Sequence, residues 1–221
     1  MNNSVGPDLE RNIDALCIYH ANIMIEVASL ADDATRKLRR AGLPVSRSSR
    51  RHVESAALSM RKICEYLAVA VVFAHHWEGN AAIDLMAWRP KDLLTDVGKL
   101  SDHPTPAPLE PFQAAGNLVP TARPVGSAQI AKVYGQLSNL LHVGSPNRIV
   151  QANFPPFDLD RLMGVSDAFQ RLANAHVIAL PNVKRVLIWN GPTRSALLGE
   201  GDGEAVFNFD HLPQLELSVY E

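Results

Sequence analysis

The feature of this sequence that most constrains its fold is a run of positions, mostly apolar, that recur every three or four residues between Leu9 and Leu38. This spacing is typical of one face of an α-helix and predicts a helix from Asp8 to Arg40. At about 1.5 Å per residue, such a helix is roughly 50 Å long, so it needs a packing partner along most of its length. The positions of this face are Leu9, Ile13, Leu16, His20, Ile23, Val27, Leu30, Ala34 and Leu38.

The sequence supplies a partner for this helix directly afterwards. Gly42 and Pro44 end the first helix, because glycine reaches left-handed backbone angles and proline lacks an N–H group. Ser48 or Ser49 can cap a second helix. Two long helices joined by a short turn form an antiparallel hairpin. The apolar face of the second helix is Val53, Ala56, Met60, Ile63, Leu67, Val71 and Ala74.

Shorter elements follow the hairpin. Helical spacing predicts helices from Ser127 to near Gly144 and from Asp158 to Leu180, where Pro181 ends the second of them. Two short helices are expected between the hairpin and these, at 81–88 and 91–100. The end of the chain changes to short segments rich in β-branched and aromatic residues, separated by turn residues such as Asn190-Gly191. These expected strands are 186–189, 205–209 and 215–220.

We therefore expect a mainly α fold, a helical bundle built on the long antiparallel hairpin, with a small C-terminal antiparallel β element. Residues 1–180 form the helical domain in this interpretation, and residues 181–221 form the β element packed on the helices. Within the helical domain, residues 101–126 contain six of the 15 prolines of the chain. Such a segment is expected to be an extended connector on the surface, or alternatively a ligand for the aromatic groove of a partner.

Composition indicates a globular protein of cytoplasmic type. The chain has 221 residues, 47% of them hydrophobic and 20% charged, which is enough for a sizeable core. The longest apolar run, 66–74, is too short to span a membrane, and no secretory signal is recognisable. The two cysteines, Cys17 and Cys64, lie in apolar helical patterns and fit a reducing compartment. We expect no membrane partner, no cofactor and no metal site.

The formal net charge of −2 conceals a strong separation of charge. Seven basic residues and no acidic one lie between residues 36 and 51, while the other 14 basic and 23 acidic residues sum to −9. If the hairpin forms, these seven cluster at its tip, where they could bind an anionic partner, either nucleic acid or an acidic protein. We call this set the basic tip: Arg36, Lys37, Arg39, Arg40, Arg47, Arg50 and Arg51.

A second candidate site is the helix segment that ends at His142. The helix 54–65 and the later Tyr134-Gly135 and Leu141-His142 pairs resemble a set of uncharacterised bacterial helical proteins, and this resemblance implies no activity. The same segment has a weaker resemblance to HEPN domains, helical proteins of bacterial defence and toxin systems, some of which cleave RNA.

Those nucleases use an arginine, a polar residue beside it and a histidine four to six residues further on, usually across a dimer. The resemblance carries the histidine over to His142 and makes Asn139 a candidate polar residue. The position of the arginine holds Gln136 or Leu137, so the charge would have to come from Arg61 or Arg148.

Three hypotheses for function follow. The preferred one is a noncatalytic interaction protein, a homodimer through its long helical faces, whose basic tip binds the anionic partner. The alternatives are a metal-independent ribonuclease of HEPN type, with His142, Arg61 and Asn139 as candidate catalytic residues, and a small-molecule sensor. The sensor would have a pocket under Trp77, Trp88 and Tyr66. His20 and His176 are expected to be core histidines, each with a hydrogen-bond partner.

Overall fold

The computed structural model describes most of the predicted helical regions and part of the β element. The described residues are 7–41, 47–79, 92, 93, 95, 105–109, 119–141, 158–200, 211–215, 217 and 219. The expected strand 205–209 and the expected helix 81–88 lie outside them. Of the expected helix 91–100, residues 92, 93 and 95 are described, and all three are helical.

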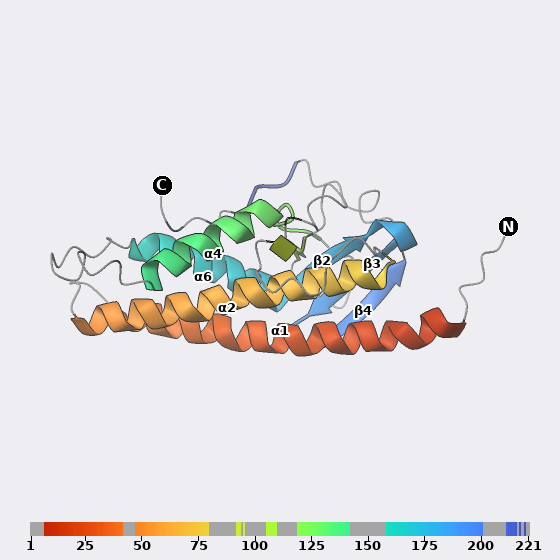
Figure 1. The fold of residues 1–221 in the computed structure, drawn as a ribbon, viewed down its shortest axis with the longest axis horizontal. Helices are drawn as coiled ribbons and strands as arrows, with labels where there is room; N and C mark the ends of the chain where they lie inside the picture. The colour runs from red at the N-terminus through yellow and green to blue at the C-terminus, as the bar shows by residue number, and fades with distance from the viewer. Residues whose placement is uncertain are drawn as a thin grey trace.

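The long antiparallel hairpin is confirmed. It consists of α1 (Pro7–Ala41) and α2 (Arg47–Trp77), which lie side by side along the length of the molecule (Figure 1). The Ser59 hydroxyl on α2 donates a hydrogen bond to Asp33 on α1 at 2.8 Å, and the rings of Tyr19 and Phe73 stack 4.0 Å apart. Because α2 already begins at Arg47, the two serines predicted as caps lie inside its first turn.

Two shorter helices cover the inner side of the hairpin. Helix α4 (Ser127–Leu141) packs against α2, and α6 (Leu159–Asn174) packs against α1. The Thr35 and Ser166 hydroxyls are 2.8 Å apart in the buried seam between α1 and α6. Figure 1 shows that α4 runs in the direction opposite to α2, so that its C-terminal end points toward the hairpin tip.

A four-stranded antiparallel sheet completes the fold, in the order β1-β2-β3-β4. The strands are β1 (Ala107–Pro108), β2 (Ala175–Leu180), β3 (Arg185–Asn190) and β4 (Ser195–Glu200), with the 3-10 turn η1 (Pro181–Val183) between β2 and β3. The expected turn at Asn190-Gly191 is confirmed, because it joins β3 to β4 in full register.

Two predictions about the β element were wrong, and one strand was missed. The helix expected to run to Leu180 ends at Asn174, and residues 175–180 form β2. Strand β4 was not expected. In the segment 215–220, the described residues 215, 217 and 219 are not in a strand, although all three are buried. The sheet therefore begins earlier than the predicted boundary at residue 181.

The proline-rich segment contributes an edge of this sheet. Strand β1 pairs Ala107 with Val177 and Pro108 with His176, and Leu109 forms a bridge with Pro120. Proline cannot donate a ladder hydrogen bond and is tolerated at a sheet edge. The described part of 101–126 is thus extended, as expected of a connector, but it is also built into the sheet.

The sheet and the helices share one hydrophobic core. The inner sheet face, with Ile178, Leu187 and Trp189, belongs to the same buried cluster as the apolar faces of α1, α2, α4 and α6. Helix α1 is long and apolar enough to cross a membrane, although core helices of soluble proteins often meet the same criteria of length and composition. Its buried face, including Leu16 and Val27, packs in this core.

Candidate functional site

The basic tip is present at one end of the hairpin, but carboxylates neutralise part of it. Lys37 and Arg36 both pair with Asp33, the latter at 3.6 Å. Arg50 pairs with Glu54 at 2.7 Å. Partial burial alone would raise the pKa of Asp33, but hydrogen bonds from Lys37 and Ser59 outweigh it and hold this pKa below the usual value. Asp33 is therefore a firmly ionised counter-charge.

Three arginines of the tip are exposed and have no acidic partner within the described part of the chain. Arg39 and Arg40 lie in the last turn of α1, and Arg51 lies in the first two turns of α2. Cations are favoured at a helix C-terminus, which suits Arg39 and Arg40, whereas Arg51 gains nothing from the dipole of α2. The side chain of Arg47 lies outside the described residues. These three arginines are called the free arginines below.

A polar groove lies beside the tip, between α1 and α6. Its volume is about 560 Å³. The Thr35–Ser166 hydroxyl pair and the 2.8 Å hydrogen bond from Gln170 to Asp32 fasten the two helices together here. The groove is lined by Ser29, Asp32, Thr35, Arg36, Arg39, Asp167 and Gln170.

The groove presents charges of both signs. Arg36 and Arg39 come from α1, and Asp167 comes from α6 and has no ion-pair partner among the described residues. The structure thus brings two predicted tip residues together with Asp167 and Gln170, which the sequence did not single out. No local pattern connects residues 36 and 167, because only the antiparallel packing of α1 and α6 makes them neighbours. The site can hold a ligand with separated charges.

The second candidate site is assembled only in part. The Arg61 guanidinium lies 4.9 Å from the centre of the Tyr134 ring and pairs with Glu65 at 3.4 Å. Asn139 is exposed. It follows Tyr134 by five positions, which places it about 140° further around the axis of α4. The structure therefore does not bring Asn139 to Arg61. His142 and Arg148 lie outside the described residues.

The residues at the position of the missing HEPN arginine have structural contacts. The side-chain oxygen of Gln136 accepts a hydrogen bond from the backbone N–H of Val219 at 3.0 Å, and Leu137 is fully buried. Leu137 is therefore closed to a phosphate, and the side-chain oxygen of Gln136 is held by the backbone.

The buried histidines are structural. His20 and His176 are hydrogen-bonded to each other, as expected of core histidines. His75 and Glu78 form a second buried pair at 2.5 Å, and Glu78 also accepts the backbone N–H of Asn182 at 3.1 Å. This pair fastens the end of α2 to η1. In the part of the chain that the structure describes, no three metal-ligating side chains come together.

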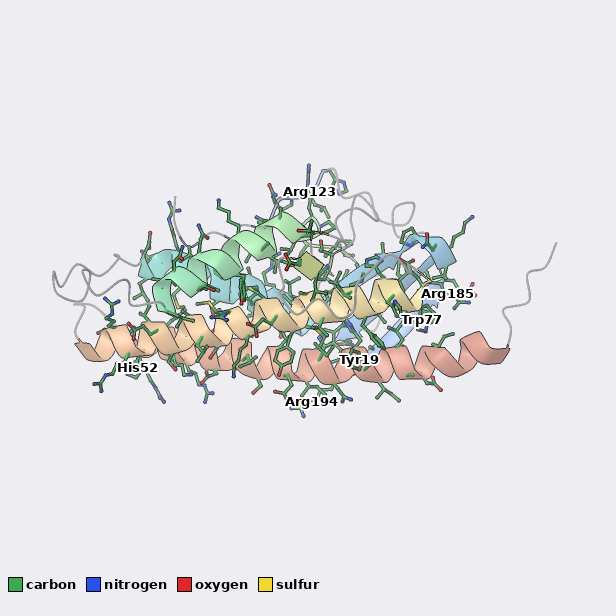
Figure 2. The ribbon with its side chains drawn as sticks, in the orientation of Figure 1. Tyr19, His52, Trp77, Arg123, Arg185 and Arg194 are labelled. Atoms are coloured by element: carbon green, nitrogen blue, oxygen red, sulfur yellow. The ribbon has the colours of Figure 1, made fainter. Side chains whose placement is uncertain are left out.

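Of the aromatic residues suggested for a sensor pocket, Tyr66 and Trp77 do not line the groove between α1 and α6. Tyr66 is exposed on α2, and Trp77 is partly buried against the core at the end of that helix. Figure 2 shows Trp77 at the end of α2 remote from the tip. Trp88 lies outside the described residues.

Comparisons with known proteins give no relative from which an activity could be transferred. No protein-family model, curated protein or solved structure matches this chain.

Proposed function

We propose that this protein is a noncatalytic interaction protein that binds an acidic protein segment through the free arginines and the adjoining groove. The observation that carries the proposal is the position of Arg39, Arg40 and Arg51. All three are exposed at one end of the hairpin, without acidic partners among the described residues. Unpaired cations gathered on one surface raise the local concentration of anions and steer their approach.

The carboxylates around the tip favour an acidic protein over nucleic acid. Asp32, Asp33, Glu54 and Asp167 all lie within or beside the set of cations. A nucleic acid carries closely and regularly spaced phosphates, which these carboxylates would repel. An acidic peptide has separated carboxylates and hydrogen-bonding amides, so it can place its charges on the arginines and avoid the aspartates.

The test is direct binding of two anionic probes, fluorescent poly-L-glutamate and fluorescent single-stranded RNA, measured by anisotropy over a range of salt concentrations. The variant Arg39→Gln/Arg40→Gln/Arg51→Gln keeps good helix-forming side chains and removes the three charges. Each exposed ion pair contributes roughly 0.2–1 kcal/mol, so poly-L-glutamate affinity is expected to fall about tenfold.

A control of equal charge removes exposed cations elsewhere. The variant Lys62→Gln/Lys132→Gln/Arg194→Asn serves this purpose, and asparagine suits position 194 because its φ is 51°. The proposal predicts that this control binds poly-L-glutamate like the wild type. If both variants lost affinity for poly-L-glutamate equally, the attraction would depend on net charge alone, and the proposal would be overturned. RNA bound more tightly than poly-L-glutamate would identify the partner as nucleic acid.

A ribonuclease of HEPN type is the second candidate, and two observations favour it. The Arg61–Tyr134 contact shows that α2 supplies a guanidinium to the helix that precedes His142 in the chain. Helix α4 also points its C-terminal end toward the tip, where a bound RNA strand would lie (Figure 1).

Incubation of the purified protein with single-stranded RNA distinguishes the two candidates. Cleavage that persists in EDTA and disappears in both His142→Ala and Arg61→Gln would establish the nuclease. RNA left intact by the wild type would exclude it. The variant Lys62→Gln is the control, because it changes an exposed neighbouring cation on α2.

A further inference from the structure

Large apolar side chains are concentrated on the exposed surface of the hairpin. Seven such side chains are exposed within the described part of the chain, and five of them belong to α1 or α2. The other two, Val119 and Leu197, lie elsewhere. The five are Ile18, Tyr19, Ile25, Leu58 and Tyr66.

On α1, Ile18 and Ile25 lie along one face, which is called the ridge below. Ile18 is 62% exposed and Ile25 is 36% exposed. Seven residues are about two helical turns, so both side chains lie on the same face. Ala21 and Asn22 stand between them, and such short side chains allow another helix to approach closely. Tyr19, stacked on Phe73 of α2, borders the ridge on one side.

Part of the apolar surface of α1 stays uncovered within one copy of the chain. The helix contains an 18-residue window apolar enough for a membrane span, yet only 28% of that window is buried. Soluble proteins rarely leave such a surface uncovered, and larger exposed apolar patches mark interaction sites.

The charges beside the ridge indicate what covers it. Asp14 precedes Ile25 by eleven residues and Arg36 follows it by eleven, about three turns in each direction, so all three share one face of α1. Asp14 is exposed, and the Arg36 side chain is 67% exposed, with a 3.6 Å contact to Asp33 and a 3.4 Å hydrogen bond to the backbone oxygen of Asp32. A parallel copy would place like charges together, whereas an antiparallel copy centred near Ile25 places Asp14 opposite Arg36 of the second copy.

We infer that the ridge of α1 is the interface of a homodimer, in which a second copy packs antiparallel with Ile25 near the two-fold axis. A two-fold contact is self-complementary, so the Asp14–Arg36 pair occurs twice, once at each end of the ridge. Arg36 also lines the groove of the proposed function, but the free arginines take no part in the dimer contact. The mass of the protein in solution therefore tests the dimer separately from the binding of an acidic segment.

The experiment measures mass in solution by light scattering after size exclusion and by sedimentation velocity at several protein concentrations. The wild type is expected at twice the 24.2 kDa of the single chain. Ile25→Glu places two carboxylates near the axis and is expected to give 24.2 kDa, with an unchanged circular dichroism spectrum. Val119→Glu is the matched control, since that side chain is 51% exposed away from the hairpin, and it is expected to stay dimeric.

Charge reversal tests the orientation of the two copies. Asp14→Arg and Arg36→Asp are each expected to weaken the dimer, and the double variant is expected to restore it. A wild type that is monomeric at every concentration overturns the inference, and so does a dimer that survives Ile25→Glu. Monomeric protein that floats with phosphatidylcholine vesicles, and loses this binding in Ile25→Glu, would assign the ridge to a membrane surface instead. A double variant no more dimeric than the single ones would refute the antiparallel arrangement.

Discussion

The Nε2 atoms of His20 and His176 lie 2.9 Å apart in the core, although 156 residues separate the two histidines in the chain. His176 Nδ1–H donates to the backbone oxygen of Leu172 at 2.8 Å, so its Nε2 carries a lone pair and accepts the proton of His20 Nε2. His20 Nδ1 is then an unprotonated acceptor, and it has no partner among the described residues. Both rings must be neutral to share one proton in this way.

Acid is therefore expected to destabilise the fold. Burial lowers the pKa of His176 to about 4, and burial together with the neighbouring ring lowers the pKa of His20 well below its usual value. Below pH 6.5 these histidines are protonated in the unfolded chain but stay neutral in the folded one. Their contribution to the free energy of unfolding is therefore fully present above pH 6.5 and is lost as the pH falls from 6.5 to about 4. His176 alone accounts for about 3 kcal/mol of this loss.

Urea unfolding at a series of pH values measures this loss. In the variant His20→Met/His176→Met, stability across the same window is expected to depend much less on pH. A wild type whose free energy of unfolding is constant over this window would show that the histidines are not buried as a neutral pair.

The hydroxyl pair of Thr35 and Ser166 is expected to show strong energetic coupling. Both residues are buried, and their oxygens are 2.8 Å apart. Ser166→Ala or Thr35→Val alone leaves one buried hydroxyl without this partner, at a cost of about 1–3 kcal/mol. In the double variant no hydroxyl remains to be satisfied, so its loss should be clearly smaller than the sum of the two. A double-mutant cycle by urea unfolding checks this, and strictly additive losses would contradict it.

Two glycines are expected to respond in opposite ways to alanine. A Cβ atom at Gly191 would lie 2.7 Å from the backbone oxygens of Ala173 and Asn174, so Gly191→Ala must displace the β3–β4 turn and should cost about 1–3 kcal/mol. Gly164 on α6 has open space around its Cβ position, and Gly164→Ala should stabilise the helix by about 0.5–1 kcal/mol. Thermal unfolding of both variants gives the comparison, and a stabilised Gly191→Ala protein would be inconsistent with this turn.

The two cysteines are expected to differ in reactivity. Burial raises the pKa of both thiols, but Cys64 is completely buried, whereas Cys17 is partly exposed. Thiolate formation and access both limit alkylation, so iodoacetamide should modify Cys17 slowly and Cys64 only after unfolding. Mass spectrometry of the labelled protein in rising urea measures this order. Labelling of Cys64 at the native rate of Cys17 would show that α2 is not packed as described.

The helical elements could be predicted because their apolar spacing extends over many turns, as in the face that includes Leu16, Val27 and Leu38. Strand β2 could not be predicted in this way. All six of its residues are buried, and a fully buried strand shows no alternation of apolar and polar residues. Ala173, Val177 and Leu180 also happen to follow helical spacing. Strand β4, Ser195–Glu200, was missed because alanine, glycine and glutamate have weak β propensity.

Of the candidate site, only the clustering of charged residues close together in the chain could be predicted from the sequence. The basic tip is visible in the sequence, and so are the neutralising pairs Asp33–Lys37 and Arg50–Glu54, which have the helical spacing of four residues. The groove could not be predicted. Asp167 comes close to Arg36 and Arg39 only because α1 and α6, which are distant in the chain, pack together.

The contact between α1 and the sheet also has a consequence for synthesis on the ribosome. Helix α1 emerges before the sheet, and His20 and the apolar side chains around it are covered only when β2 and β3 have left the exit tunnel. At ordinary elongation rates this interval is on the order of ten seconds. During it, the nascent chain exposes the apolar face of α1, which offers a binding site to chaperones.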